Sequence, residues 1–171
     1  EMNLPNAEQV AARCFLIEQF LDELLRHEPT ALEFKPRPTT VAIHVHCHAK
    51  ALTHPAYMHR LAARHPALSI VIDHAAKPDA GDLPGWEAEM RAIADRPNVA
   101  CKLSGLLTEP GLTPRIAEVA AILLDAFGTD RLIWGSDWPV LTLAGDYAAW
   151  LAQAQEQIAP SARHAVFGGN A

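Results

Sequence analysis

Hydrophobic and polar positions along this chain follow two alternating periods, and they predict a series of strands and helices. Short apolar runs bounded by turn residues predict strands at 41–46, 68–73, 98–103 and 132–134. Apolar residues at helical spacing predict helices at 7–26, 54–64, 84–94, 113–127 and 146–158. From residue 68 onward, strand and helix alternate with short connections, which is typical of right-handed βα units that build a parallel sheet.

This alternation predicts an α/β fold, namely a partial TIM-barrel-like run of βα units with about four parallel strands, preceded by an N-terminal helix. About four strands are too few to close an eight-stranded barrel, so we expect the chain to hold only part of one. The sheet then has exposed edges, and we expect a homo-oligomer or a partner chain to cover them. Three prolines interrupt residues 28–40, and we divide the chain into an N-terminal segment, 1–60, and a C-terminal partial barrel, 61–171.

Composition limits the classes of function. The 171 residues are 50% hydrophobic and 20% charged, which is typical of a soluble globular protein. A net charge of −6 without a basic cluster argues against nucleic acid as a partner, and the lack of a long apolar run argues against the membrane. No signal-peptide pattern is found, so we expect a cytoplasmic protein that acts on a small molecule. The three cysteines lack CxxC spacing and are expected to be free thiols.

Polar residues follow the predicted strands at the ends where chemistry collects in parallel sheets. Asp137 follows the apolar run in the stretch LIWGSDWPV. His74 follows a second apolar run, and Lys102 and Ser104 lie at the end of a third. Because these ends meet at one edge of a parallel sheet, we expect the four side chains to face the same cleft. A carboxylate can take a proton from water, an imidazole can stabilise or protonate an oxygen, and a cation can hold the substrate. The set suits hydrolysis of an ester or lactone.

We predict Asp137 and His74 as the catalytic pair. The predicted substrate-binding residues are Lys77, Lys102, Ser104 and Trp138. Structural alternatives are that Asp137 caps the next turn, His74 caps its loop, and Lys102 is a solvated charge. The run Gly135-Ser136-Asp137 lacks the GxSxG spacing, and there is no Gly-rich phosphate loop, which excludes a serine hydrolase and a nucleotide-binding protein.

Three histidines stand at alternate positions at the end of the strand predicted at 41–46. In an extended segment His44, His46 and His48 project to one face, and imidazoles at this spacing can converge on a divalent ion such as Zn²⁺ or Mn²⁺. We take His44 and His46 as candidate metal ligands and a divalent metal as the candidate cofactor. The alternative is a polar strand end whose imidazoles bond to backbone or water.

Four stretches, in order, resemble the amidohydrolase-related family that includes L-fuconolactonase and 2-pyrone-4,6-dicarboxylate lactonase. They are RHPALSIVIDHAAKP, NVACKLSG, FGTDRLIWGSDWPV and the terminal FGGNA, and the resemblance covers residues from about 65 to 171. It implies a distorted TIM barrel and hydrolysis of sugar lactones or related carbonyl compounds. By this resemblance, His74 is the active-site histidine after a late barrel strand, and Asp137 is the last-strand aspartate that activates water. Some relatives bind a divalent metal, and others act without one.

The first sixty residues, approximately, resemble a different group, the Cys-rich domain of iron-sulfur and FAD-linked oxidoreductases. The resemblance rests on CFLIEQFLDELL and on the HCHAK stretch, while the paired-cysteine CCG motif of that domain is absent. It adds two alternatives to the hydrolase: a fragment of an oxidoreductase subunit, or an inactive partial barrel that needs a partner. In a rival interpretation, His44 and His46 are the HxH pair of amidohydrolases and form a metal set with His74 and Asp137.

Overall fold

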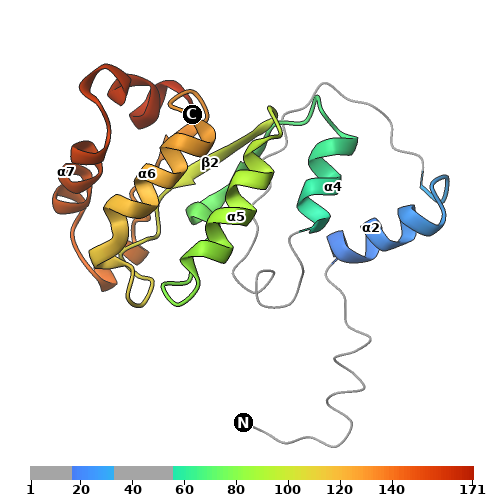
Figure 1. Cartoon of the computed structure of the whole chain (residues 1–171), viewed down its shortest axis with the longest axis horizontal. Coiled ribbons are helices and arrows are strands. Elements are labelled where there is room, and N and C mark those ends of the chain that lie inside the picture. Colours follow the sequence, from blue (N-terminus) through green and yellow to red (C-terminus); the bar gives the residue numbers. More distant parts are fainter. Residues whose placement is uncertain (1–16, 33–55) are drawn as a thin grey trace, which may run out of the picture.

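The structure, a computed structural model, describes residues 17–32 and 56–171, and its centre is a parallel sheet (Figure 1). The strands lie in the order β1 (Ile70–Ile72), β2 (Val99–Leu103) and β3 (Leu132–Trp134). All three were predicted from the sequence, and the strand predicted at 41–46 lies outside the described residues. Because both strand pairs are parallel, the carboxyl ends of the strands meet at one edge of the sheet.

The described part of the chain contains five helices. They are α2 (Ile17–His27), α4 (Ala56–Arg64), α5 (Leu83–Ala94), α6 (Ile116–Phe127) and α7 (Tyr147–Gln157). Short helical turns complete the described chain: η1 (Asp73–Ala76), η2 (Thr113–Arg115), η3 (Val140–Leu143), η4 (Pro160–Ala162) and η5 (Ala165–Gly169). The predicted helices are confirmed where they fall on described residues, except that the one predicted from residue 113 begins with η2. Across residues 17–32 and 56–171, we find no helix with the length and apolar character needed to cross a membrane.

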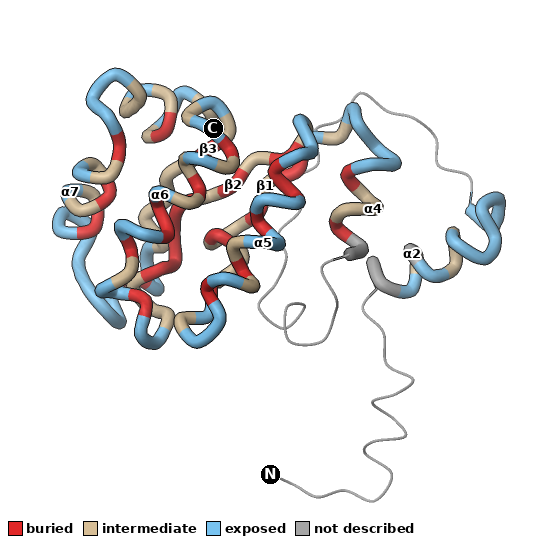
Figure 2. Tube along the Cα trace, viewed as in Figure 1, coloured by how far each residue is buried: buried red, intermediate tan, exposed pale blue. Residues whose placement is uncertain are grey.

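The burial of alternate strand residues shows which face of the sheet the helices cover (Figure 2). In β2, Val99, Cys101 and Leu103 are buried, whereas Ala100 and Lys102 are half-buried. Successive side chains of a strand point to opposite faces, so the buried set lies under α5 and α6 and the other set lies on the opposite face. Parallel sheets are usually covered on both faces. The less covered face is the one that carries the polar groups described below.

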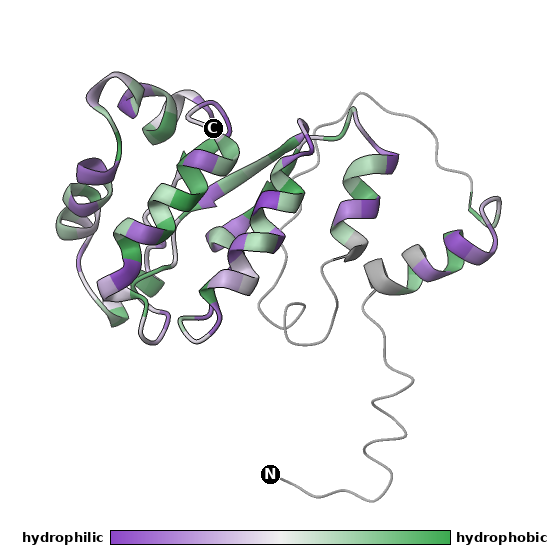
Figure 3. Ribbon diagram, in the orientation of Figure 1, coloured by the Kyte–Doolittle hydropathy of each residue, from purple (hydrophilic) through white to green (hydrophobic). Residues whose placement is uncertain are grey.

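The hydrophobic core lies between the sheet and the helices α5 and α6. Leu103, Leu132 and Leu123 belong to it and are fully buried. In Figure 3, most of β2 is coloured as hydrophobic, whereas α5 and α6 carry both colours, as expected of helices with one apolar face. Trp150 of α7 is also buried, and its Nε1 donates to the carbonyl oxygen of Gly135 at 2.9 Å. This bond ties α7 to the residue that follows β3.

Side-chain hydrogen bonds to backbone carbonyls close the amino end of the sheet. Arg131 Nη1 lies 2.9 to 3.0 Å from the carbonyl oxygens of three residues. Asn98 Nδ2 likewise lies 2.9 to 3.3 Å from three carbonyl oxygens. Asn170, in the terminal FGGNA, donates to the carbonyl oxygens of Thr129 and Leu132 at 2.7 and 2.9 Å. These three side chains hold loops together at the end of the sheet opposite the predicted site.

Candidate active site

His74 lies in an unusual turn directly after β1. His74, Ala75, Ala76 and Lys77 all have a left-handed backbone, with φ of 49°, 49°, 56° and 52°. A left-handed residue with a side chain costs roughly 1–2 kcal/mol, so the surroundings must hold the turn in place. The fully buried Ala75 accepts a hydrogen bond from Trp86 Nε1 at 2.8 Å, and Lys77 N donates to His74 O at 2.7 Å. Strained backbone held in this way concentrates at functional sites.

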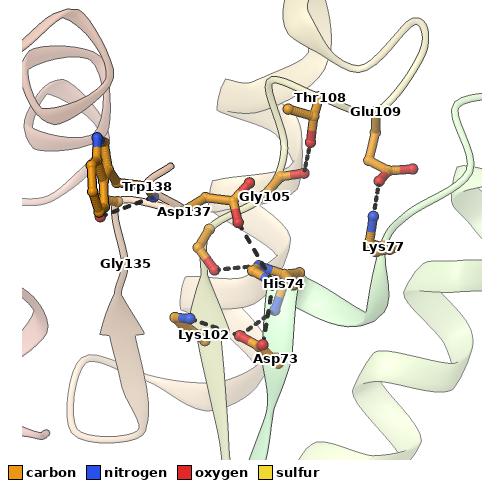
Figure 4. A network of polar contacts seen from close by, with 12 residues as sticks. Asp73, His74, Lys77, Lys102, Gly105, Thr108, Glu109, Gly135, Asp137 and Trp138 are labelled. Atoms are coloured by element: carbon orange, nitrogen blue, oxygen red, sulfur yellow. Dashed lines mark hydrogen bonds and ion pairs between the residues drawn. The ribbon is translucent and has the colours of Figure 1, made fainter. Parts of the chain in front are cut away.

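The imidazole of His74 lies between a hydroxyl and two carboxylates (Figure 4). Its Nδ1 lies 2.9 Å from Ser104 Oγ, and Ser104 is fully buried at the end of β2. Its Nε2 lies 3.2 Å from Asp73 Oδ2 and 3.6 Å from Asp137 Oδ1. Carboxylates only accept hydrogen bonds, so the proton of a neutral imidazole belongs on Nε2, and Nδ1 accepts from the Ser104 hydroxyl. The structure therefore brings His74, Ser104 and Asp137 together, as the parallel-strand argument predicted.

Asp137 reaches this position from the loop after β3. It is also left-handed, with φ of 60°, and its side chain is 11% exposed. In the described part of the chain its carboxylate faces His74 and makes no hydrogen bond to backbone N–H groups of the next turn. The 3.6 Å separation from His74 is longer than a hydrogen bond, so the carboxylate remains able to accept a proton from another group.

Asp73 is a member of the site that the sequence argument missed, because it was counted as the last residue of a strand. Its Oδ1 accepts from Lys102 Nζ at 2.9 Å and from the backbone N of His74 at 3.1 Å. The signal was a carboxylate at the end of the apolar run SIVID, immediately before the candidate histidine. Lys102 thus lies at the site, where it contacts the carboxylate beside His74.

Two glycines allow these side chains to approach one another. Gly105 has φ of +67°, and a Cβ built on it would lie 2.7 Å from His74 Nδ1. A Cβ built on Gly135 would lie 2.4 Å from Lys102 Cε. Both contacts are shorter than van der Waals packing allows, so a side chain at either position would displace His74 or Lys102.

The remaining predicted residues lie at the margins of the site. Lys77 Nζ lies 2.5 Å from Glu109 Oε1, on the side of His74 away from Asp137 (Figure 4). Trp138 follows Asp137 and is 68% exposed, with its ring on the other side of Asp137. Glu109 is a second residue that the sequence argument missed. It sits in a loop after β2, and no local pattern pairs it with Lys77.

Burial lowers the pKa of His74 below its ordinary value, and the carboxylates of Asp73 and Asp137 oppose this shift without cancelling it. The positive charges of Lys102 and Lys77 also lower the pKa. The imidazole is therefore neutral at pH 7. A neutral imidazole with its proton on Nε2 can donate a hydrogen bond to an oxygen that becomes negative during a reaction.

The side chains of the site can be compared with the ligands that a divalent metal ion requires. Zinc in proteins takes three or four ligands from His, Cys, Asp or Glu. Residues 17–32 and 56–171 contain no group of three or more such side chains arranged to hold a metal ion. The predicted ligands His44 and His46 lie outside the described ranges. The described residues alone do not fit a metal, and we assign no chemical step to one.

The comparisons with known proteins show the family to which the chain belongs. The family model described as amidohydrolase matches residues 35–171, and the chain belongs to this family. An L-fucono-1,5-lactonase of Burkholderia ambifaria is 48% identical over 136 residues, which is 71% of this chain and 47% of that protein. An L-fucono-1,5-lactonase of Burkholderia multivorans is 41% identical over 128 residues, which is 64% of this chain and 43% of that protein. The chain spans about half the length of these curated relatives.

Solved structures extend the likeness to nearly the whole chain. An amidohydrolase from Burkholderia multivorans with bound HEPES has a TM-score of 0.65 and 27% identity, over 98% of this chain and 60% of that one. An amidohydrolase from the same organism with bound zinc has a TM-score of 0.64 and 26% identity, over 98% of this chain and 59% of that one. The prediction of an α/β fold that forms part of a TIM-like barrel is confirmed.

The comparisons confirm one of the two resemblances inferred from the sequence and do not support the other. The resemblance to amidohydrolases is confirmed. The comparisons do not support the resemblance of the first sixty residues to an oxidoreductase Cys-rich domain, since the amidohydrolase match begins at residue 35 and includes the HCHAK segment. The division of the chain at residue 60 stays a prediction. Of the three cysteines, Cys101 is a buried free thiol, and Cys14 and Cys47 lie outside the described residues.

Proposed function

We propose that this chain serves in the hydrolysis of a lactone by water, with Asp137 as the general base and His74 as its electrophilic partner. The observation that carries the proposal is the approach of His74 Nε2 to Asp137 Oδ1, 3.6 Å apart at the carboxyl edge of the sheet. This edge is where the active sites of (β/α) barrels lie. Further support comes from the two relatives named L-fucono-1,5-lactonase.

The proposed reaction uses one proton transfer in each direction. Asp137 accepts a proton from water while the water oxygen attacks the lactone carbonyl carbon, and negative charge develops on the former carbonyl oxygen. His74 Nε2–H donates a hydrogen bond to that oxygen. When the ring C–O bond breaks, the leaving oxygen takes the proton held by Asp137, and the product is a hydroxy acid. Lactone and water are consumed in equal amounts, and both side chains return to their starting states.

Four further side chains are proposed to prepare the site for substrate. Ser104 and Lys102 act on the catalytic pair, because the hydroxyl orients the imidazole and the ammonium holds Asp73 beside it. Lys77 lies at one margin of the site and Trp138 at the other. We propose that they contact the substrate, Lys77 through a charged hydrogen bond and Trp138 through the apolar face of its exposed indole.

The test of the proposed function is the variant Asp137→Asn assayed with L-fucono-1,5-lactone. Loss of a general base typically lowers turnover by about 10²- to 10⁴-fold, and we expect a loss in that range. The matched control is Asp95→Asn, at the exposed end of α5, which should retain the starting rate. Unchanged turnover in Asp137→Asn would contradict the proposed base. An absence of turnover in the starting protein would instead favour an inactive partial barrel.

A divalent metal held by His44 and His46 is proposed as the cofactor. The zinc-bound amidohydrolase of Burkholderia multivorans supports this proposal. Elemental analysis of the purified chain should find about one zinc or manganese per chain, and the double variant His44→Ala/His46→Ala should have lost it. The control is His65→Ala, at an exposed position after α4. Equal metal content in the double variant and the starting protein would contradict the proposed ligands.

A homo-oligomer or a partner chain is proposed to cover the sheet. Among the residues that the structure describes, β1 and β3 each pair only with β2, so each leaves one edge without a strand partner. Unpaired edges recruit further strands, so we expect a discrete assembly larger than one chain. Light scattering on the purified protein tests this expectation, and a folded monomer would contradict it.

A further inference from the structure

A pocket opens beside the left-handed turn that carries His74. Its volume is about 300 Å³, and its lining residues are Lys77, Pro78, Asp79, Ala80, Glu109 and Pro110. The pocket is joined to the catalytic histidine through the backbone, since Lys77 N donates to His74 O at 2.7 Å. Lys77, which lines the pocket, thus belongs to the same left-handed turn as His74.

An ion pair stands at the wall of this pocket. Lys77 Nζ lies 2.5 Å from Glu109 Oε1, and the two side chains are 32% and 20% exposed. Partial burial reduces screening by water, so Glu109 offsets much of the positive charge that Lys77 would otherwise present. The positive charge of Lys102, the second lysine of the site, is offset in the same way, because Lys102 Nζ lies 2.9 Å from Asp73 Oδ1.

The loop that carries Glu109 is held against the catalytic histidine. Gly105 packs directly on the His74 ring, and Thr108 Oγ1 donates to Gly105 O at 3.3 Å. Glu109 N lies 3.4 Å from Leu106 O, which continues the same turn. The position of the Glu109 carboxylate is therefore set by the same short loop that presses on His74.

These pairs decide which charge the site favours in a substrate. In the described part of the chain, two lysines, Lys77 and Lys102, lie around His74 and the pocket together with four carboxylates, those of Asp73, Asp79, Glu109 and Asp137. A lactone with carboxylate substituents would meet this negative excess. An uncharged lactone with several hydroxyls would instead find a carboxylate to accept its O–H groups and an ammonium to donate to its oxygens.

We propose that Glu109 is a specificity-determining residue, which neutralises Lys77 so that the pocket takes the hydroxyl groups of an uncharged sugar lactone and rejects lactones that carry carboxylates. The inference rests on the proposed lactone hydrolysis for its substrate and names the chemical class of that substrate. Glu109 contacts Lys77 and takes no part in the proton transfers assigned to Asp137 or in the hydrogen bond assigned to His74.

The experiment compares the starting protein with Glu109→Gln, using two probes. Binding of the dianion 2-pyrone-4,6-dicarboxylate is measured by calorimetry, and kcat and KM are measured with L-fucono-1,5-lactone. With the negative charge of Glu109 removed from beside Lys77, we expect the dianion to bind about tenfold more tightly. We expect KM for the uncharged lactone to rise roughly tenfold while kcat changes much less, since only binding contacts are lost.

Two further variants complete the design. Glu87→Gln is the control, because Glu87 also pairs with a cation, Arg91, but lies on an exposed face of α5. In Glu109→Gln/Lys77→Gln, the gain in dianion binding should disappear, because the positive charge of Lys77 is its source. Dianion binding within twofold of the starting protein in Glu109→Gln would overturn the proposal. Calorimetry needs no turnover, so a failure of lactone hydrolysis would count against the proposed function without deciding this test.

Discussion

The two ends of the parallel sheet use polar side chains in opposite ways. At the amino end, Arg131 and Asn98 direct their donors at backbone carbonyls, three each, and so join loops to strands. At the carboxyl end, His74 and Asp137 contact other side chains, in backbone of left-handed conformation. Side chains that hydrogen-bond to backbone carbonyls stabilise the fold. Side chains that contact one another at the carboxyl end can instead exchange those contacts for contacts with a substrate. We therefore expect substitutions at the two ends to separate activity from stability.

The largest expected effect is on activity at the carboxyl end. His74→Gln should lower lactone turnover by about 10²- to 10³-fold, because the flexible amide does not hold a donor at the position from which Nε2–H meets the developing negative oxygen. Circular dichroism should show a folded protein, since Gln retains a polar side chain beside Ser104. The control is His59→Gln, which removes the imidazole of a half-buried histidine in α4. Turnover in His74→Gln equal to that of the control would remove His74 from the mechanism.

At the amino end we expect the reverse outcome. Arg131→Met keeps most of the aliphatic stem but removes the donor that lies 2.9 to 3.0 Å from three carbonyl oxygens. Leaving such groups without a partner should lower the free energy of unfolding by about 1–3 kcal/mol, as measured by urea denaturation. Turnover per folded molecule should stay within twofold. Arg91→Met, on the exposed face of α5, is the control, and an equal loss in both variants would show that the amino end has no special role.

Two glycines sharpen the comparison, because both have a positive φ of nearly the same size but their surroundings differ. Gly105 and Gly128 have φ of +67° and +68°; a Cβ on Gly105 would lie 2.7 Å from His74 Nδ1, and one on Gly128 would have nothing within 4 Å. Alanine at either position should cost roughly 1 kcal/mol of stability through backbone strain. Only Gly105→Ala should also lower turnover, because it displaces the imidazole. Equal turnover in the two variants would mean that the packing of Gly105 on His74 is irrelevant to catalysis.

The sequence predicted the features of this fold that follow from local pattern. Short apolar runs marked β1, β2 and β3, and the rule that parallel strands share a carboxyl edge placed His74 beside Ser104 and Asp137. The pairing of Lys77 with Glu109 could not be predicted, because it depends on the path of two loops that no periodicity describes. Asp73 was missed for a related reason: a strand pattern gives no information on the left-handed turn that follows it.

The smallest expected effect concerns pH and again arises at the carboxyl end. Burial holds the pKa of His74 below 6.5, so in mildly acidic solution the unfolded chain binds a proton that the folded chain does not. The contribution of His74 to stability is therefore complete above pH 6.5 and is lost as the pH falls below it, towards the lowered pKa of the folded state. In urea denaturation with a chelator present, the free energy of unfolding should fall more between about pH 7.5 and about pH 5.5 in the starting protein than in His74→Gln. Parallel pH curves for the two proteins would mean that the imidazole has the same pKa folded and unfolded, and that burial does not favour the neutral Nε2–H donor used in the mechanism.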